Sequence, residues 1–487
     1  MSLSQTMAST VATLDTRTLI RKIRDSETGG LESVKNEHYF HGLVPKAQTA
    51  KLLKKKGDYL VRQALQSECS RRRSDDSFEQ FIISVRTEKN TTKLVRTEEI
   101  SEICKDPSKV ESDTCVRHIL VKYSRRERLY YVKDFGFKHV SGLIDYHQRK
   151  KHPLDEEGTL LKYPVKRAKW QLNHEQVKKD KLIGSGAFGE VWSGELRLGI
   201  LRKRQVAIKI IIGSMTVADH EGFFEEAMLM HEFVHPNVVR LHGVALNENP
   251  VMIVMELAEE NSVLDAVSAS RIRRDKKGKP LTALPDNPKL LNVRGPADPS
   301  VQIRTKLCLG AARGLAYIAS KNVIHRDIAA RNVLIGRGYV AKISDFGLGV
   351  MAKERREKRL NKVPVRYLSP ETLKNGSYTS KTDIWSFGVF LWEVFHDGLE
   401  PYYSIDTSAE IVKYVKQGNT LPNSSEFYPE SLWLLTTKCF QFNPDDRPTA
   451  SACVDVISQE YSKYKWKLNF SFCVCSCAFA IQNEVKK

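Results

Sequence analysis

The chain has 487 residues, of which 41% are hydrophobic and 28% are charged, and its formal net charge is +19. This length exceeds what one hydrophobic core usually supports, so we expect two or three domains, and the composition excludes an intrinsically disordered chain. The positive charge fits nucleic acid, anionic membrane, or phosphorylated and acidic proteins as partners, and by itself it does not choose among them.

Residues 1–36 are predicted to form a flexible leader. They are polar and rich in Ser and Thr, and they lack the apolar stretch of a secretory signal. The nine cysteines are scattered along the chain, with no C-x-x-C pair. Both observations favour reduced thiols and a cytoplasmic location.

Residues 37–153 show the patterns of short β-strands and amphipathic helices. The strands are predicted at 81–85 and 118–121, and the helices at 47–55 and 140–149. Between the two strands, the charged stretch of about 87–115 predicts a solvated loop. Residues 154–176, which are basic and contain proline, are expected to be a linker.

A third region, residues 177–460, opens with strands and closes with helices, for example at 301–320 and 383–395. A polar insertion at about 268–300 is rich in Lys, Arg, Pro and Gly, and we expect it to be a surface loop. We find no internal repeats in the chain.

The tail, residues 461–487, contains an almost wholly apolar run at 468–481 with three of the cysteines. This run is too short to cross the bilayer core as a helix. Three interpretations stay open for it: a strand or helix docked on the preceding domain, a palmitoylated or membrane-touching segment, and a segment without function. The second would give the protein a peripheral contact with the plasma membrane.

A G-x-G-x-x-G-x-V pattern occupies residues 184–191. Glycine lets the backbone approach phosphate oxygens, and a β-hairpin here would close over ATP. The same pattern opens dinucleotide-binding folds, but the V-A-I-K run at 206–209 suits the next strand of a kinase hairpin instead. The residues assigned to ATP here are Gly184, Ser185, Gly186, Ala187, Phe188, Gly189, Val191, Ala207 and Lys209.

Lys209 is expected to contact the α- and β-phosphates, and its ammonium group needs an anionic partner. Glu226, on the periodic helix predicted at 221–231, suits that role. Without the neighbouring motifs, a surface position on an amphipathic helix would be the better interpretation of Glu226. Together with those motifs, Lys209 and Glu226 are assigned to the catalytic set.

The central motif is H-R-D-I-A-A-R-N at residues 325–332, followed by D-F-G at 345–347. Asp327 is placed to accept the proton of a substrate hydroxyl group. Asn332 and Asp345 would supply oxygen ligands to Mg²⁺, which neutralises the phosphates of ATP. The two motifs at this separation are highly specific for phosphoryl transfer.

On these motifs, residues 177–460 resemble a eukaryotic protein kinase, which implies a bilobal fold, ATP as the phosphate donor and Mg²⁺ as the cofactor. The later motifs agree with this resemblance. S-P-E at 369–371 matches the A-P-E position, and the D-I-W-S-F-G run from Asp383 matches the buried helix that follows it. Arg447 is expected to form a structural ion pair with Glu371.

The resemblance is closest to tyrosine kinases. Serine/threonine kinases carry Lys two residues after the catalytic Asp, where this sequence has Ala329, and Arg331 follows in the tyrosine-kinase arrangement. Arg331 is therefore assigned to the catalytic set. Residues 362–367 resemble the segment that holds the substrate phenol, with Tyr367 where Trp is usual.

Within tyrosine kinases, the sequence resembles the non-receptor Fes/Fer group. K-W-Q-L-N-H-E at 169–175 and I-V-M-E-L at 253–257 carry this resemblance. It implies that Met255 lies behind the adenine ring. It also implies that the backbone of Glu256 to Ala258 hydrogen-bonds the base.

Y-F-H-G at 39–42 and D-Y-L-V-R at 58–62 resemble the opening of a Src-homology-2 (SH2) domain across residues 37–153. This implies a central antiparallel sheet flanked by two helices, so the whole chain is expected to be α+β. It also implies binding of phosphotyrosine, with Arg62 forking onto two phosphate oxygens.

Three further residues are assigned to the phosphotyrosine site, and two of them depart from the SH2 pattern. His118 matches the histidine that flanks the phosphotyrosine ring. Lys46 stands where an Arg is usual, so one phosphate contact becomes a point charge. Ser67 is the hydroxyl donor nearest in sequence, because Gln63-Ala64 replaces the usual Glu-Ser.

The segment between Asp345 and Pro364 contains no Tyr, Thr or Ser. Kinases with Arg before the catalytic Asp, here Arg326, usually need a phosphate on this loop to order it. Our hypothesis is that Glu354 or Glu357 substitutes for that phosphate. A disordered loop is the alternative.

These motifs predict a non-receptor protein-tyrosine kinase that is targeted by its SH2 domain. The expected partners are phosphotyrosine-containing proteins and protein tyrosine substrates, and nucleic acid is not expected. The alternative is a phosphotyrosine-binding adaptor with a weakly active or inactive kinase domain.

Overall fold

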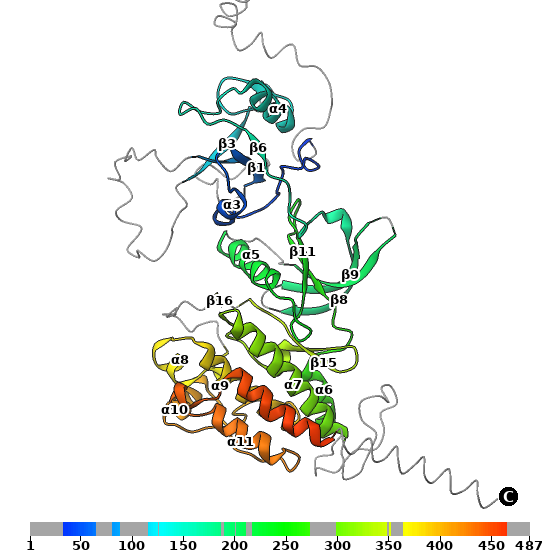
Figure 1. Cartoon of the computed structure of the whole chain (residues 1–487), viewed down its shortest axis with the longest axis vertical. Helices are drawn as coiled ribbons and strands as arrows, with labels where there is room; N and C mark the ends of the chain where they lie inside the picture. The colour runs from blue at the N-terminus through cyan, green and yellow to red at the C-terminus, as the bar shows by residue number, and fades with distance from the viewer. Residues whose placement is uncertain are drawn as a thin grey trace, which may run out of the picture. The chain divides into compact units, whose positions relative to one another are not determined.

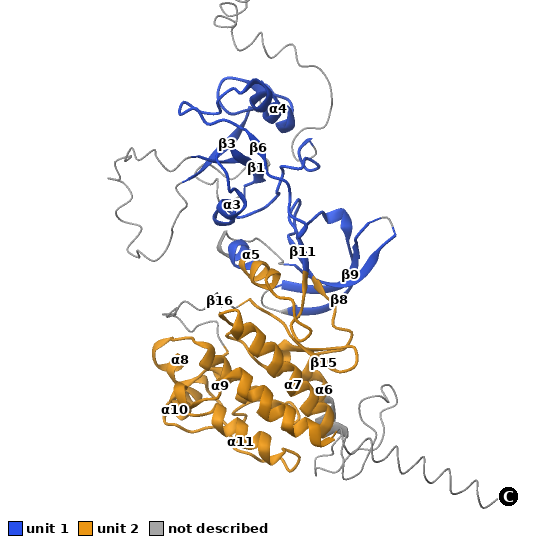
Figure 2. Ribbon diagram, in the orientation of Figure 1, with its two compact units in different colours: residues 1–224, 242–254 blue, residues 225–241, 255–487 orange. Residues whose placement is uncertain are grey.

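The computed structural model describes residues 33–64, 80–87, 115–124, 126–186, 189–199, 201–210, 217–272, 299–347, 350–351 and 364–464. The chain divides into two compact units (Figure 2). Unit 1 comprises Met1–Phe224 and His242–Val254, and unit 2 comprises Glu225–Leu241 and Met255–Lys487. The division falls inside the predicted kinase domain, because the strands that carry the glycine-rich pattern belong to unit 1.

The first sheet of unit 1 has six strands in the order β5-β4-β3-β2-β1-β6 (Figure 1). Neighbouring strands are antiparallel, except that β6 pairs parallel with β1. The strands and the two helices of this part of the chain are β1 (Asp58–Gln63), β2 (Phe81–Arg86), β3 (Val116–Ser124), β4 (Leu129–Tyr131), β5 (Gly136–Phe137), β6 (Tyr163–Pro164), α3 (Lys46–Leu52) and α4 (Val140–Lys150). The strands and helices predicted for residues 37–153 are thus confirmed, with somewhat different bounds.

The core of this first part forms where α4 meets the sheet. Val140, Leu143 and Ile144 follow the spacing of one helix face and are fully buried. They share one cluster with apolar residues of the strands, including Tyr59 and Phe81. Helix and strand periodicity therefore bury a common apolar surface.

The second sheet of unit 1 continues into unit 2 at the end of β12, and its order is β7-β11-β12-β10-β9-β8. Its strands are β7 (Gln171–Leu172), β8 (Val177–Gly186), β9 (Gly189–Arg197), β10 (Lys203–Ile210), β11 (Leu241–Ala245) and β12 (Met252–Glu256). The β8–β9 hairpin carries the glycine-rich pattern, and β10 carries V-A-I-K as the next antiparallel strand. The hairpin arrangement predicted from those two motifs is confirmed.

Unit 1 also contains a close contact between its two sheet-bearing parts. The backbone N–H of Leu43 donates to the carbonyl oxygen of Leu246 at 2.8 Å. The neighbouring Gly42 has φ +63°, and a Cβ atom there would lie 2.0 Å from the same oxygen. Only glycine therefore fits at position 42 in this arrangement.

Unit 2 is mostly helical, and α7 and α9 pack side by side within it (Figure 1). Its helices are the C-terminal part of α5 (Val217–His231), α6 (Val263–Ile272), α7 (Pro299–Ser320), α8 (Pro370–Asn375), α9 (Ser380–Phe395), α10 (Ser408–Lys416) and α11 (Glu430–Cys439), with a last helix at 450–464. Two short ladders, β13 (Val323–Ile324) with β16 (Val350–Met351) and β14 (Val333–Gly336) with β15 (Val340–Ile343), complete it. The buried helix predicted from Asp383 is confirmed, because nearly every residue of α9 is buried.

One boundary prediction is wrong. Both ends of the loop expected at about 268–300 are helical instead, because α6 continues to Ile272 and α7 begins at Pro299. Residues 268–272 contain no Gly or Pro, so nothing in them breaks the helix. The rest of that loop, most of the charged loop at 87–115 and the apolar tail lie outside the described residues. In the described part of the chain, no helix has the length and apolar character needed to cross a membrane.

Candidate active site

The β14–β15 hairpin of unit 2 brings the two predicted metal ligands to one end of a ladder. The ladder runs from Val333 paired with Ile343 to Gly336 paired with Val340. Just beyond it, the backbone N–H and the hydroxyl of Ser344 donate to the carbonyl oxygen of Asn332 at 2.8 and 2.9 Å. Asp345 is the next residue, so both ligand-type side chains start from this end.

The carboxylate of Asp327 is held through both of its oxygens. The guanidinium of Arg331 donates to Oδ1 at 2.5 Å, and Nδ2 of Asn332 donates to Oδ2 at 2.6 Å. Nδ2 of Asn332 also donates to the carbonyl oxygen of Asp327 at 2.8 Å. Three residues predicted separately for catalysis and metal binding are thus brought together, and Asp327 has a defined orientation.

These side chains fit a magnesium ion. Because the amide nitrogen of Asn332 faces Asp327, its amide oxygen is the atom that can coordinate a cation. Asp345 contributes a carboxylate, and hard oxygen ligands of this kind are what Mg²⁺ prefers. The backbone of Asp345 has φ +60°, an uncommon conformation for a residue other than glycine.

Within unit 2, the D-F-G segment lies beside α5 and beside Phe233, which follows that helix. Phe346 is buried, and its ring centroid lies 5.0 Å from that of Phe233 and 4.8 Å from that of His325. A Cβ atom at Gly347 would lie 3.5 Å from Oε2 of Glu226. The carboxylate predicted to serve Lys209 therefore lies beside this segment.

Asp383, on α9, anchors the backbone just before Asp327. Its two carboxylate oxygens accept the backbone N–H groups of His325 and Arg326, both at 2.8 Å. Its burial raises the pKa of this carboxyl group, and hydrogen bonds and positive charges oppose that shift. From the sequence, Asp383 was predicted only as the start of a buried helix. An acidic residue in so apolar a run could also have indicated a buried hydrogen-bonding role.

The predicted ion pair between Glu371 and Arg447 is confirmed. Nη1 and Nη2 of Arg447 donate to the two carboxylate oxygens of Glu371 at 2.7 and 2.8 Å. The Arg447 side chain is fully buried, and its Nε donates to the carbonyl oxygen of Gln441. This pair ties α8 to the segment before the last helix.

Unit 1 carries the glycine-rich hairpin and the predicted ATP lysine. Lys209 is buried on β10, paired with Val191 of β9, and Ala207 lies two residues before it. Gly184, Ser185, Gly186 and Gly189 lie on the hairpin, whereas Ala187 and Phe188 lie outside the described residues. Lys209 and Glu226 belong to different units, so their pairing stays a prediction.

The predicted hinge residues lie at the start of the second segment of unit 2. Met255 is buried at the end of β12, and Ala258 follows the strand. Glu256 donates its backbone N–H to Arg240, and its carboxylate pairs with Lys342 at 2.9 Å. The side chain of Glu256 is thus engaged within unit 2, and contact of the hinge backbone with adenine stays a prediction.

A separate basic cluster lies on the first sheet of unit 1. Arg62 of β1 is 2% exposed although it is charged. His118 of β3 lies opposite Ser84, and the two side chains hydrogen-bond at 2.9 Å. The pKa of His118 is lowered to about 4 by burial and then by the positive charges of Arg62 and Lys46. Three of the four predicted phosphate-site residues are therefore brought together, and Ser67 lies outside the described residues.

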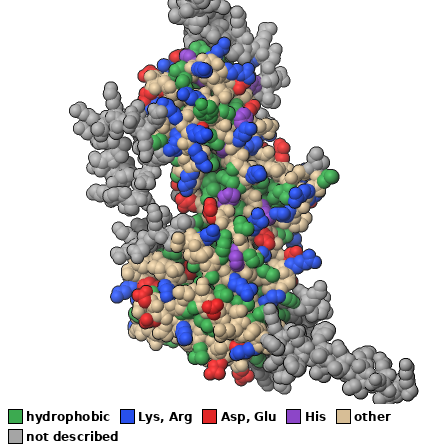
Figure 3. Space-filling model, viewed as in Figure 1, with side chains coloured by type: hydrophobic (Ala, Val, Ile, Leu, Met, Phe, Trp, Pro, Cys, Tyr) green, Lys and Arg blue, Asp and Glu red, His purple; other side chains and the backbone are tan. Residues whose placement is uncertain are grey.

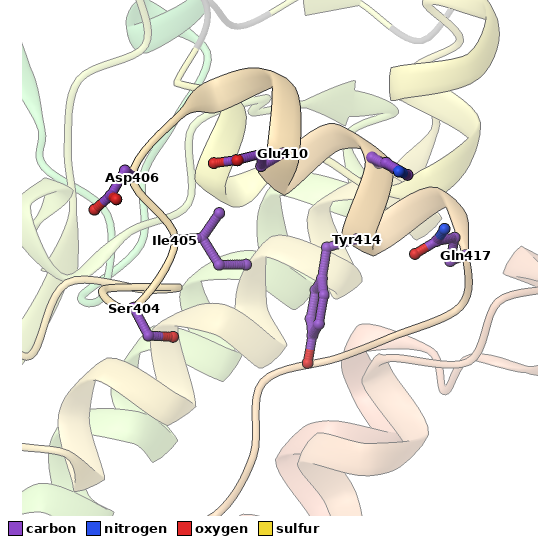
Figure 4. Close-up of a pocket in the computed structure, with 7 residues that line it drawn as sticks. Ser404, Ile405, Asp406, Glu410, Tyr414 and Gln417 are labelled. Atoms are coloured by element: carbon purple, nitrogen blue, oxygen red, sulfur yellow. The ribbon is translucent and has the colours of Figure 1, made fainter.

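An open surface pocket of about 450 Å³ lies at α10 (Figure 4). It is lined by Ser404, Ile405, Asp406, Glu410, Lys413, Tyr414 and Gln417. The carboxylate of Glu410 caps its own helix by accepting from Thr407. No residue assigned to catalysis lines this pocket, so it is not the active site.

Residues 177–457 match the family described as protein tyrosine and serine/threonine kinase. Fer-related kinase 1 of Caenorhabditis elegans is 29% identical over 447 residues, which cover 92% of this chain and 99% of that protein. Tyrosine-protein kinase Fer of Homo sapiens is 31% identical over 423 residues, which cover 85% of this chain and 43% of that protein. Tyrosine-protein kinase transforming protein Fps of Avian sarcoma virus (strain PRCII) is 30% identical over 421 residues, which cover 85% of this chain and 66% of that protein. The chain thus spans less than half of the human Fer kinase.

An oriented Asp327, two predicted metal ligands at one end of a hairpin and a buried anchoring helix fit a protein kinase, with a sheet-bearing N-terminal lobe and a helical C-terminal lobe. The family match covers more than half of the chain. The chain belongs to the protein tyrosine and serine/threonine kinase family, and its similarity to Fer, Fer-related kinase and Fps makes it a Fes/Fer-like, ATP-dependent protein-tyrosine kinase.

Proposed function

We propose that this protein transfers the γ-phosphate of ATP to tyrosine in proteins, with Asp327 accepting the proton of the substrate phenol. The proposal rests on the two hydrogen bonds that Arg331 and Asn332 donate to the Asp327 carboxylate. A carboxylate fixed in this way can meet an incoming hydroxyl without reorganising. Arg331 also balances the negative charge of Asp327.

The remaining residues are proposed to bind and orient ATP. The Gly184–Gly189 turn would supply backbone N–H groups to the phosphates, and Lys209 would pair with them and with Glu226. The backbone of Glu256 to Ala258 would hold the adenine, with Met255 behind it. Mg²⁺, held by Asn332 and Asp345, would neutralise phosphate charge as the loose transition state develops.

The test of catalysis is phosphate incorporation into a Glu/Tyr copolymer from Mg-ATP. We expect the wild-type protein to be active and Asp327→Asn to lose about two to four orders of magnitude in kcat, the usual contribution of a general base. An inactive wild type, or an Asp327→Asn variant as active as the wild type, would contradict the proposal. The first outcome would favour the adaptor with an inactive kinase domain.

The cluster of Arg62, Lys46 and His118 is proposed to bind phosphotyrosine, so that residues 37–153 act as an SH2 domain that targets the kinase to phosphorylated proteins. A buried, planar guanidinium can donate two parallel hydrogen bonds to a phosphate. Because burial and these two cations lower the pKa of His118, its ring is neutral, and the positive charge that would meet the phosphate comes from Arg62 and Lys46. Lysine and arginine side chains are mixed with acidic ones over the face shown in Figure 3, which fits protein partners better than a nucleic-acid track.

We expect Arg62→Ala to weaken binding of a phosphotyrosine peptide by at least a hundredfold in calorimetry, because it removes a buried charge partner. Arg117→Ala is the matched control. Arg117 lies on the same strand as His118, but its guanidinium pairs with Asp155 and Glu157. If the wild type and Arg62→Ala bound the peptide with equal affinity, the assignment of Arg62 to a phosphotyrosine site would be wrong.

A further inference from the structure

The chain has 17 tyrosines, and all of them lie in the part of the chain that the structure describes. Tyr163 is 58% exposed and Tyr403 is 59% exposed, whereas the others are buried or half-buried. A substrate tyrosine must project from its own protein, because its phenol oxygen has to reach the γ-phosphate of ATP inside the active site of a kinase. Tyr163 and Tyr403 are the tyrosines that meet this condition in the folded chain.

Tyr403 lies in a turn between α9 and α10, within unit 2. The turn is closed by the backbone N–H of Ile405, which donates to the carbonyl oxygen of Tyr402 at 2.9 Å. The next residues, Ser404, Ile405 and Asp406, belong to no helix or strand and line the open pocket at α10 (Figure 4). The segment after Tyr403 can therefore extend along another protein without the loss of a helix or a strand.

The charges around the two exposed tyrosines are opposite in sign. Residues 396–410, which reach seven positions to either side of Tyr403, contain four acidic side chains and no Lys or Arg. The same window around Tyr163, residues 156–170, contains two acidic and four basic side chains. The two tyrosines are thus matched in exposure and differ in the charge of their surroundings.

The sequence beside the predicted substrate segment is basic. Residues 353–361 directly precede the segment at 362–367 that is predicted to hold the substrate phenol, and they contain five basic and two acidic side chains. Opposite charges favour the encounter of two proteins, and like charges disfavour it. An active site with this flanking sequence should accept Tyr403 of another molecule more readily than Tyr163.

The turn that carries Tyr403 is held in place within unit 2. Arg366, in the predicted substrate segment, donates from Nη1 to the carbonyl oxygens of Pro401 and Tyr402 at 2.7 and 3.1 Å. The buried ring of Tyr402 packs edge-on against that of Tyr414 on α10, with 6.0 Å between the centroids. Because these contacts fix the turn, Tyr403 cannot move onto the substrate segment of its own molecule while unit 2 stays folded.

We infer that Tyr403 is a phosphorylation site of this protein, and that a second copy of the chain is the kinase that modifies it. The phenol oxygen of Tyr403 forms a bond to the γ-phosphorus of ATP, and the bond from that phosphorus to the leaving ADP breaks. The phenol proton passes to Asp327 of the second copy. This inference rests on the proposed function, because the same active site has to phosphorylate tyrosine.

The first test is to incubate the purified full chain with Mg-ATP and to measure the phosphate on each tyrosine by mass spectrometry. We expect at least about tenfold more phosphate on Tyr403 than on Tyr163, because opposite charges steer the encounter. Tyr403→Phe should remove most of the phosphate, and Tyr163→Phe, the matched control, should leave the total within about twofold of the wild type. Phosphate mainly on Tyr163, or on any other tyrosine, would overturn the inference.

Dilution shows whether a second copy is the enzyme. If two copies must meet, dilution of the protein by about tenfold should lower the fraction phosphorylated per minute about tenfold. A fraction per minute that does not change on dilution would overturn the role of the second copy. The Asp327→Asn variant gives an independent measurement, because as a substrate for Tyr403→Phe it should gain phosphate on Tyr403, and no gain would also overturn the inference.

Activity on the Glu/Tyr copolymer distinguishes failure of this inference from failure of the proposed function. Tyr403→Phe should keep kcat on the copolymer within about twofold of the wild type, because Tyr403 acts as a substrate and not in catalysis. A wild type that phosphorylates the copolymer but not Tyr403 would overturn this inference and leave the proposed function intact. A wild type that is inactive on the copolymer would overturn both.

Discussion

Arg326, the residue before Asp327, has an uncommon backbone conformation and a cation–π contact. Its backbone has φ +72°, and its guanidinium carbon lies 4.1 Å from the ring centroid of Tyr378. A cation–π contact of this kind offsets part of the cost of burying an arginine. Arg326 therefore has aromatic compensation that does not require a phosphate on the following loop.

We expect catalysis to be independent of phosphate on that loop, because residues 346–363 offer no hydroxyl group. Purified protein treated with a phosphatase should keep kcat within about twofold of the untreated sample. Glu354 and Glu357, the loop residues proposed to stand in for a phosphate, lie outside the described residues. Loss of activity on dephosphorylation that preincubation with ATP restores would contradict this expectation and would locate a control site elsewhere in the chain.

At the scale of elements, α9 organises unit 2 because it combines an apolar surface with a few buried polar side chains. Asp383 near its start holds the backbone of His325 and Arg326, and Glu393 near its end holds Ala330 and Tyr367. A buried helix thus fixes two points of the catalytic loop through hydrogen bonds. Apolar packing alone would not specify those backbone positions as sharply.

The buried ion pair between Glu371 and Arg447 fixes the position of α8. We expect Glu371→Ala to lower the free energy of unfolding by roughly 3–5 kcal/mol. The reason is that the fully buried Arg447 side chain would lose its carboxylate partner. Denaturant unfolding monitored by tryptophan fluorescence measures this change.

The matched control for Glu371→Ala is Glu400→Ala. Glu400 pairs with Arg366 at 2.9 Å, but its side chain is 63% exposed. Exposed pairs usually contribute no more than about 1 kcal/mol. A similar loss in both variants would show that burial does not set the strength of the Glu371 pair.

At the scale of the whole molecule, motifs with fixed spacing predicted far more than composition did. The glycine-rich hairpin, V-A-I-K on the next strand and the Glu371–Arg447 pair could be predicted because each depends on a short signature. The end of α6 at Ile272 could not, since its polar residues suit a helix or a loop equally well. The hydrogen bonds of Glu393 could not either, because its partners Ala330 and Tyr367 are distant in sequence and meet it only in the folded unit.

The contact of Gly42 with Leu246 makes a last prediction about how unit 1 holds together. We expect Gly42→Ala to open this contact, because the added Cβ would meet the Leu246 carbonyl oxygen at 2.0 Å and because φ is +63°. The amide of Leu43, which donates to that oxygen, should then exchange faster with deuterium. Binding of a phosphotyrosine peptide should persist, since the cluster of Arg62, Lys46 and His118 is formed by other residues.

Gly158→Ala is the control that distinguishes the effect of backbone strain from the effect of losing the contact with Leu246. Gly158 has φ +77°, yet a Cβ atom there would meet nothing within 4 Å. Because of its backbone conformation, Gly158→Ala should therefore lose about 1–2 kcal/mol of stability, as Gly42→Ala does for the same reason. It should leave the exchange of the Leu43 amide unchanged. If both variants accelerated exchange at Leu43 equally, general destabilisation would explain the effect of Gly42→Ala. If only Gly42→Ala did so, the close approach at Leu246 contributes to joining the front part of unit 1 to the sheet that carries the glycine-rich hairpin.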